Sequence, residues 1–150
     1  MWYNRVVANL GEIPAFIDYY EGELVAAKAD IKIRGNVERA LSNLPGETEH
    51  RFNQLQEIEA ILEHLNIQLR RIRQTHYKKY LEAYARALTS RDAEKYVDGE
   101  DEVIDMETII NEVSLLRNKW LGVMKGIEQK SFMIGHITRL RVAGMEDLVV

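Results

Sequence analysis

Residues 55–72 read LQEIEAILEHLNIQLRRI, and their apolar side chains recur at alternating steps of three and four. This spacing places the apolar side chains on one face of a helix, as in coiled coils and helical bundles. The stretch contains no proline or glycine, and most of its residues favour helix. We therefore predict a long helix with an apolar seam, formed by Leu55, Ile58, Leu62, Leu65, Leu69 and Ile72.

The neighbouring sequence sets the expected ends of this helix and predicts two earlier helical segments. Acidic residues after Pro45-Gly46 suit a helix start, so the long helix is expected over 47–88. Pro45-Gly46 is also a turn signal, which is expected to end a short helix over 37–44. A first helix is predicted over 14–31, with a break near Gly35-Asn36.

A second apolar seam follows in the C-terminal third of the chain. It again uses steps of three and four, and consists of Met106, Ile109, Val113, Leu116, Trp120, Val123 and Ile127. A bend or break is expected around residues 126–131, after which Phe132, Ile134 and Ile137 continue the stripe. Two long seams offer more apolar surface than one small core can cover. We therefore expect homo-oligomerisation through the residues of this second seam and its continuation.

Length and composition favour one all-α domain over residues 1–150, an elongated helical bundle or coiled-coil protomer that assembles into a homo-oligomer. Its N-terminal helices are expected over 1–95, and an acidic turn plus oligomerisation helices over 96–150. The chain has no cysteine, which excludes disulfides and cysteine zinc sites. No apolar run approaches the roughly 20 residues that span a membrane, so no membrane partner is expected.

The strongest functional signal is a local excess of positive charge interleaved with aromatic residues. Residues 66–95 contain eight Lys or Arg and three Asp or Glu, although the whole chain has a formal net charge of -4. Cations neutralise phosphates, and aromatic faces stack on unpaired bases, so this mixture favours single-stranded nucleic acid. The candidate nucleic-acid-binding residues are Arg70, Arg71, Arg73, His76, Tyr77, Lys78 and Lys79, with Tyr80 and Tyr84 as neighbouring aromatics.

An acidic segment motivates a rival hypothesis in which nucleic acid has no part. Residues 97–116 contain seven acidic residues and no basic one. The basic helix of one copy could pair with the acidic helix of another, so the rival function is a structural coiled-coil adaptor or assembly scaffold. An EF-hand is not expected, because Gly99 follows Asp98 directly and the calcium-loop spacing is missing.

Catalytic motifs are weak in this sequence. It has no glycine-rich phosphate loop and no nucleophile elbow. Glu47 and His50 form one copy of a spacing that di-iron helical bundles use twice, which leaves a metal-dependent bundle as a third hypothesis. We expect a protein that is not an enzyme and that needs no metal or cofactor.

Three segments also carry a family resemblance. Residues 71–77, RIRQTHY, resemble the basic motif closed by paired aromatics in the UvsY family, the recombination mediators of large tailed phages. Residues 122–137, GVMKGIEQKSFMIGHI, resemble that family's C-terminal segment without a gap, and the acidic turn over 98–101 resembles it more loosely. The resemblance spans roughly residues 67–137. The C-terminal positions that match are Gly122, Ile127, Phe132, Ile134, His136 and Ile137.

The resemblance implies a non-enzymatic recombination mediator. Such a protein forms a homo-oligomer, binds single-stranded DNA and helps a RecA-like recombinase to displace a single-strand-binding protein. Its setting would be DNA recombination, repair and replication in the cytoplasm of the infected bacterial host. The family's basic motif contributes to DNA binding, and this role transfers to Arg71 and Arg73.

Overall fold

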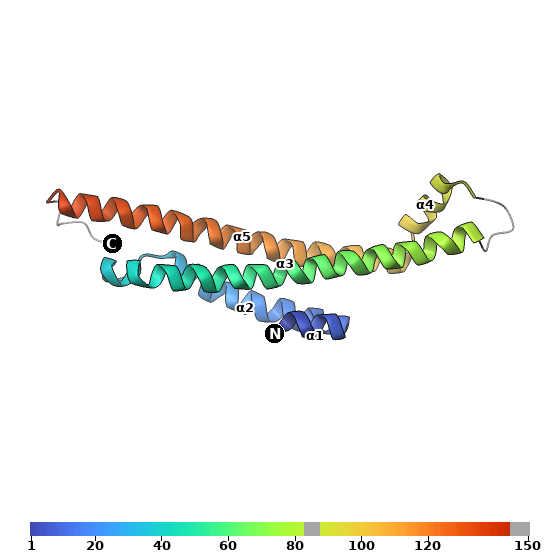
Figure 1. Cartoon of the computed structure of the whole chain (residues 1–150), viewed down its shortest axis with the longest axis horizontal. Coiled ribbons are helices and arrows are strands. Elements are labelled where there is room, and N and C mark those ends of the chain that lie inside the picture. Colours follow the sequence, from blue (N-terminus) through green and yellow to red (C-terminus); the bar gives the residue numbers. More distant parts are fainter. Residues whose placement is uncertain (83–87, 145–150) are drawn as a thin grey trace. The chain divides into compact units, whose positions relative to one another are not determined.

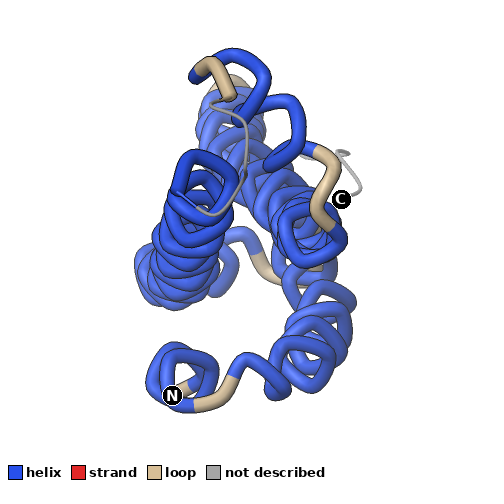
Figure 2. The backbone as a smooth tube through the Cα atoms, turned by 90° about the vertical axis from the view of Figure 1, so that its right-hand side faces the viewer, coloured by secondary structure: helices blue, strands red, loops and turns tan. Residues whose placement is uncertain are grey.

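The computed structural model of the chain describes residues 1–82 and 88–144, and these residues form helices joined by short loops (Figures 1 and 2). No strand occurs in the described ranges, so the prediction of an all-α fold is confirmed. The elements are α1 (Trp2–Ala8), a 3-10 turn η1 (Leu10–Glu12), α2 (Ile13–Ile31), α3 (Val37–Glu82), α4 (Ser90–Asp98) and α5 (Asp101–Val142).

The chain folds as two compact units, and both long helices contribute to each of them. Unit 1 comprises Met1–Ile58 and Leu116–Val150, and unit 2 comprises Glu59–Leu115. The units divide α3 and α5 part-way along their lengths, because each half of a long helix packs with different shorter elements. The sequence-based division into N-terminal helices over 1–95 and C-terminal helices over 96–150 stays a prediction.

The loop between α2 and α3 lies where the sequence predicts a break. Gly35 has a φ of 66°, a left-handed conformation that glycine adopts without steric cost. The side chain of Asn36 then accepts a hydrogen bond of 2.7 Å from the backbone N–H of Glu38. This bond satisfies one of the free N–H groups at the start of α3.

The prediction that a helix ends at Pro45-Gly46 is wrong, because α3 continues through both residues. A proline inside a helix costs about 3 kcal/mol through its missing N–H and its ring. Here Pro45 and Gly46 are exposed, so water can solvate the carbonyl that loses its helical partner. Ala40 and Leu44 are buried just before them and keep this turn packed against unit 1.

The end of α3 and the helix that follows it also differ from expectation. The described part of α3 ends at Glu82, and Leu88, where the helix was predicted to end, is not helical. Residues 83–87 lie outside the described ranges. Helix α4 was not predicted from the sequence. At its start the Thr89 hydroxyl oxygen accepts a hydrogen bond from the backbone N–H of Asp92. Threonine three residues before an aspartate is a recognised helix-start signal.

Helix α5 is continuous, so the predicted bend around residues 126–131 is absent. Gly126 lies against the side chain of Ile31 on α2, which occupies the space that a Cβ would need. Lys130 is also buried, and its ammonium donates to the Asp30 carbonyl oxygen at 2.7 Å and to Glu47 at 2.9 Å. These contacts bind α5 to α2 and α3 across the expected break.

The core of unit 1 contains one end of each apolar seam, namely Leu55 and Ile58 of the first and Leu116 to Ile127 of the second. Trp120 is fully buried and meets the ring of Tyr20 edge-on, with 5.7 Å between the ring centroids. Buried polar groups accompany this core, since Arg51 is only 5% exposed and donates to Asp30 at 2.8 Å and to Glu23 at 3.0 Å. The buried apolar side chains that surround them include Phe16, Leu24, Ala27, Leu55, Ile58, Leu116, Val123, Ile127, Ile134 and Ile137.

Candidate nucleic-acid interface

A small core in unit 2 orients the basic segment of α3. Tyr80 from α3, Ala93 and Val97 from α4, and Val103 from α5 are buried together. Partly buried apolar side chains pack against this cluster, and they are Leu69, Ile72, Tyr77 and Leu88. Because Ile72 and Tyr80 face the core, the residues on the other side of α3 must face solvent.

The basic residues on that outer side are Arg70, Arg71, Lys78 and Lys79, which we call the basic strip. All four are exposed. Arg70 has an ion pair of 3.3 Å with Glu63, but both side chains are exposed, and such surface pairs contribute little to stability. The strip therefore offers several cations to a polyanion at low cost in lost ion pairs.

A cleft of about 390 Å³ adjoins the basic strip within unit 2. The half-buried ring of Tyr77 lies in it, so the cleft combines one aromatic side chain with cations and an amide. A stacked base and its flanking phosphates require this kind of lining. The residues that line the cleft are Arg70, Arg73, Gln74, Tyr77, Glu94 and Val97.

Arg73 belongs to the same cleft but is already engaged by acidic residues. Its guanidinium donates to Asp98 at 2.7 Å and lies 3.8 Å from a carboxylate oxygen of Glu107. The sequence pattern predicts Arg73 as a phosphate contact and gives no signal that Asp98 is its partner. The acidic segment that seemed suited to a neighbouring copy therefore contacts the basic segment of its own chain.

His76 is engaged in the same way. Its Nε2–H group donates to Glu102 at 2.8 Å, and its Nδ1 lies 3.7 Å from Glu100. The imidazole is mostly covered, with 16% of the side chain exposed. The structure therefore places His76 among the carboxylates at the start of α5 and away from the basic strip.

Tyr80 does not provide an exposed face for a base. The residue is 9% exposed, its hydroxyl donates to Glu100, and its ring stacks on that of Tyr96 with 5.3 Å between centroids. Its burial follows from its position one turn after His76, on the face that meets α4 and α5. Tyr84, the next tyrosine of the predicted set, lies outside the described residues.

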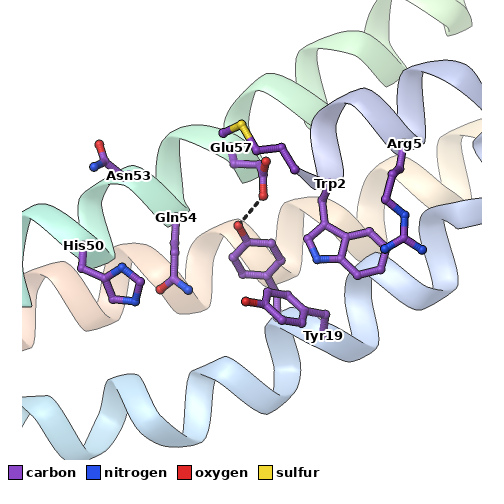
Figure 3. Close-up of a pocket in the computed structure, with 9 residues that line it drawn as sticks. Trp2, Arg5, Tyr19, His50, Asn53, Gln54 and Glu57 are labelled. Atoms are coloured by element: carbon purple, nitrogen blue, oxygen red, sulfur yellow. Dashed lines mark hydrogen bonds between the residues drawn. The ribbon is translucent and has the colours of Figure 1, made fainter.

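A second pocket, of about 570 Å³, lies in unit 1 (Figure 3). Trp2 from α1 and Tyr19 from α2 face Gln54 and Glu57 from α3. The Tyr20 hydroxyl donates to Glu57 at 2.6 Å, and burial together with this carboxylate raises the pKa of Tyr20 above its ordinary value.

Several polar groups of this unit 1 pocket form hydrogen bonds within unit 1. Glu57 also accepts from the backbone N–H of Tyr3 at 3.3 Å, and Gln54 donates to Glu23 at 3.2 Å. These bonds hold α1 and α2 against α3. Glu47, part of the metal-site hypothesis, is paired with Lys130, and the described residues contain no group of three His, Cys, Asp or Glu placed to hold a metal ion.

The residues predicted to mediate oligomerisation are mostly inside one chain. Met106, Val113, Leu116, Trp120, Val123, Ile127, Ile134 and Ile137 are buried within the protomer. Ile109 is half-buried, and Phe132 is 58% exposed. Packing within the chain therefore covers most of the predicted oligomerisation residues, and Phe132 is the one that stays largely exposed.

Comparison of the chain with protein-family models, with curated proteins and with solved structures finds no match. In the parts of the chain that the structure describes, no helix is long and apolar enough to cross a membrane. The geometry of unit 2 is therefore the main basis for a functional proposal.

Proposed function

We propose that this chain binds single-stranded DNA along the basic strip of α3. The observation that carries the proposal is that α3 exposes four cations and that one of them, Arg70, also lines the cleft that contains Tyr77. Phosphates would lie along Arg71 and Lys78, and one unstacked base would enter the cleft over the Tyr77 ring. A duplex hides its base faces, so the Tyr77 contact favours single strands.

The acidic residues of unit 2 restrict where the strand can lie. Asp98, Glu100 and Glu102 lie at the end of α4 and the start of α5, where they repel phosphate. The backbone of the strand is then confined to the outer side of α3. A handful of phosphate contacts per chain is weak and salt-sensitive, so useful affinity requires several linked copies.

The wider role that we propose is that of a recombination mediator. The chain would assemble as a homo-oligomer and hold single-stranded DNA. It would then help a RecA-like recombinase to load where a single-strand-binding protein covers the DNA. The expected place of action is the cytoplasm of a phage-infected bacterium. The proposal rests on the resemblance of residues 71–77 and 122–137. It includes no catalysis, so ATP hydrolysis by the purified chain alone would contradict it.

The DNA-binding proposal can be tested with a fluorescent oligo-dT across a salt series. We expect salt-sensitive binding that is stronger than binding to duplex DNA, and a steep loss in the double variant Arg71→Ala, Lys78→Ala. The matched control is Lys28→Ala, Arg139→Ala, which removes two exposed cations from α2 and α5. Equal affinity of the two double variants, or no binding of the native chain at low salt, would overturn the proposal.

The second candidate function is a coiled-coil adaptor or assembly scaffold. It is favoured by the large apolar side chains exposed on unit 1, among them Phe52 and Phe132. This candidate would replace the first if the native chain associates with itself but shows no salt-sensitive binding to oligo-dT. The same DNA titration therefore separates the two candidates.

A further inference from the structure

Unit 1 has an open apolar groove between α3 and α5, with a volume of about 550 Å³. Phe52 from α3 is 48% exposed and Leu121 from α5 is 38% exposed, although both are large apolar side chains. Such an exposed apolar patch commonly marks a contact with another macromolecule. The lining residues that the argument uses are Leu44, Phe52, Leu121, Met124, Lys125 and Glu128.

The α5 side of the groove presents an ordered row of side chains. Leu121, Lys125, Glu128 and Phe132 follow one another at steps of four, three and four, which keeps them on one helix face. All four are exposed. Among the residues that the structure describes, neither Lys125 nor Glu128 has an ion-pair partner. Two unpaired side chains of opposite charge, Lys125 and Glu128, therefore lie between two apolar side chains in the row.

This row is complementary to itself when reversed. If two copies of α5 lie antiparallel about a two-fold axis between Gly126 and Ile127, Lys125 of one copy faces Glu128 of the other, and the reverse contact forms as well. Leu121 of one copy then faces Phe132 of the other. A parallel two-fold pairing would instead place Lys125 opposite Lys125, which is repulsive.

We propose that a second copy of this chain docks on the α3–α5 groove of unit 1, with the two α5 helices antiparallel. We favour a second copy as the partner because the row of apolar and charged residues matches its own reverse. An unrelated partner would show such a match only by coincidence. This surface differs from the buried seam, so no core residue has to leave its packing. The inference deepens the proposed function, because it names the surface through which two copies of the proposed homo-oligomer meet.

The test is the mass of the full chain in solution without DNA, measured by sedimentation equilibrium. We expect the native chain to dimerise. Lys125→Glu and Glu128→Lys should each raise the dimer dissociation constant about tenfold or more, because each change converts two attractive contacts into repulsive ones. An equimolar mixture of the two variants should form a heterodimer with nearly native affinity, since opposite charges face each other again.

The controls are Lys28→Glu and Glu112→Lys, which invert exposed charges on α2 and on the unit 2 part of α5. They should leave the dissociation constant unchanged, and far-UV circular dichroism should show native helix content in all four variants. A native chain that stays monomeric at about 100 μM, where even weak specific dimers form, would overturn the proposal. So would a mixture that does not recover association. A monomeric native chain would also remove the homo-oligomer from the proposed function, whereas a dimer that does not bind oligo-dT would contradict the DNA-binding proposal alone.

Discussion

The guanidinium of Arg73 donates a hydrogen bond of 2.7 Å to the carboxylate of Asp98, a residue 25 positions further along the chain. This bond joins the basic segment of α3 to the end of α4. It also places a negative charge beside the cleft in which we propose that a base of single-stranded DNA stacks. Arg73 therefore contributes less to DNA binding than its position in the basic segment suggests.

Removing the charge of Asp98 should strengthen DNA binding. In Asp98→Asn the Arg73 guanidinium loses its closest ionic partner and becomes available to phosphate. We expect an affinity for oligo-dT about threefold higher, the size of one exposed charge contact, with a slightly steeper salt dependence. The control is Glu112→Gln, which makes the same change in net charge on an exposed part of α5. Equal gains in both variants would show a general charge effect and contradict the prediction.

Two glycines on α5 should respond in opposite ways to alanine. Nothing lies within 4 Å of a Cβ built on Gly122, so Gly122→Ala should raise the free energy of unfolding by about 1 kcal/mol through helix propensity. A Cβ on Gly126 would lie 2.7 Å from Cδ1 of Ile31. Overpacking of this kind costs about 1–3 kcal/mol, so Gly126→Ala should lower the free energy of unfolding or leave it unimproved.

Urea denaturation of the two glycine variants measures both effects. If Gly126→Ala stabilises the chain as much as Gly122→Ala does, then Ile31 does not pack against Gly126. The close contact between α2 and α5 would then be incorrect.

Replacing Arg51 should destabilise unit 1 strongly. Its side chain is almost fully buried, and it is paired with Glu23 and Asp30. Arg51→Met removes the cation and leaves both carboxylates without their partner, a change that costs about 3 kcal/mol. Denaturant unfolding should show this loss, whereas Arg39→Met, at an exposed arginine of the same helix, should change stability by less than about 0.5 kcal/mol. Similar stabilities of the two variants would contradict the burial of Arg51.

Acid should weaken unit 1 through Glu23. Hydrogen bonds from Gln54 and Arg51 lower the pKa of Glu23 below its ordinary 4.5. A carboxylate whose pKa is lower in the folded state stabilises the fold above its unfolded pKa, and this contribution disappears as the pH falls through the folded pKa. The free energy of unfolding should therefore decrease below about pH 4.5, and the decrease should be smaller in Glu23→Gln. An identical pH dependence in the variant would rule out Glu23 as the titrating group.

Local sequence patterns predicted helix over most of α2, α3 and α5, but they gave no prediction of α1. The steps of three and four from Leu55 to Ile72 and from Met106 to Ile127 repeat over several turns, and both stretches are helical. The turn near Gly35 was also predicted, because glycine there adopts a backbone conformation that other residues avoid. These signals are strong because each depends on residues that are close in sequence.

Two element boundaries could not be predicted from local signals. Pro45-Gly46 usually marks a turn, but buried Ala40 and Leu44 keep α3 helical through the pair. Helix α4 has a capping threonine at Thr89, yet nine residues make only a marginal helix in isolation. Its stability depends on Ala93 and Val97, which are buried against Tyr80. Both the continuation of α3 and the formation of α4 therefore depend on packing between residues that are distant in sequence.

The sequence by itself determined that the chain is helical and that its positive charge gathers on one segment of α3, because helix periodicity and charge are properties of neighbouring residues. Only the tertiary structure decided which cations remain exposed. Arg71 and Lys78 face solvent, whereas Arg73 meets Asp98 and His76 meets Glu102. These partners are more than 20 residues apart, and only the packing of α3 with α4 and α5 brings their side chains together.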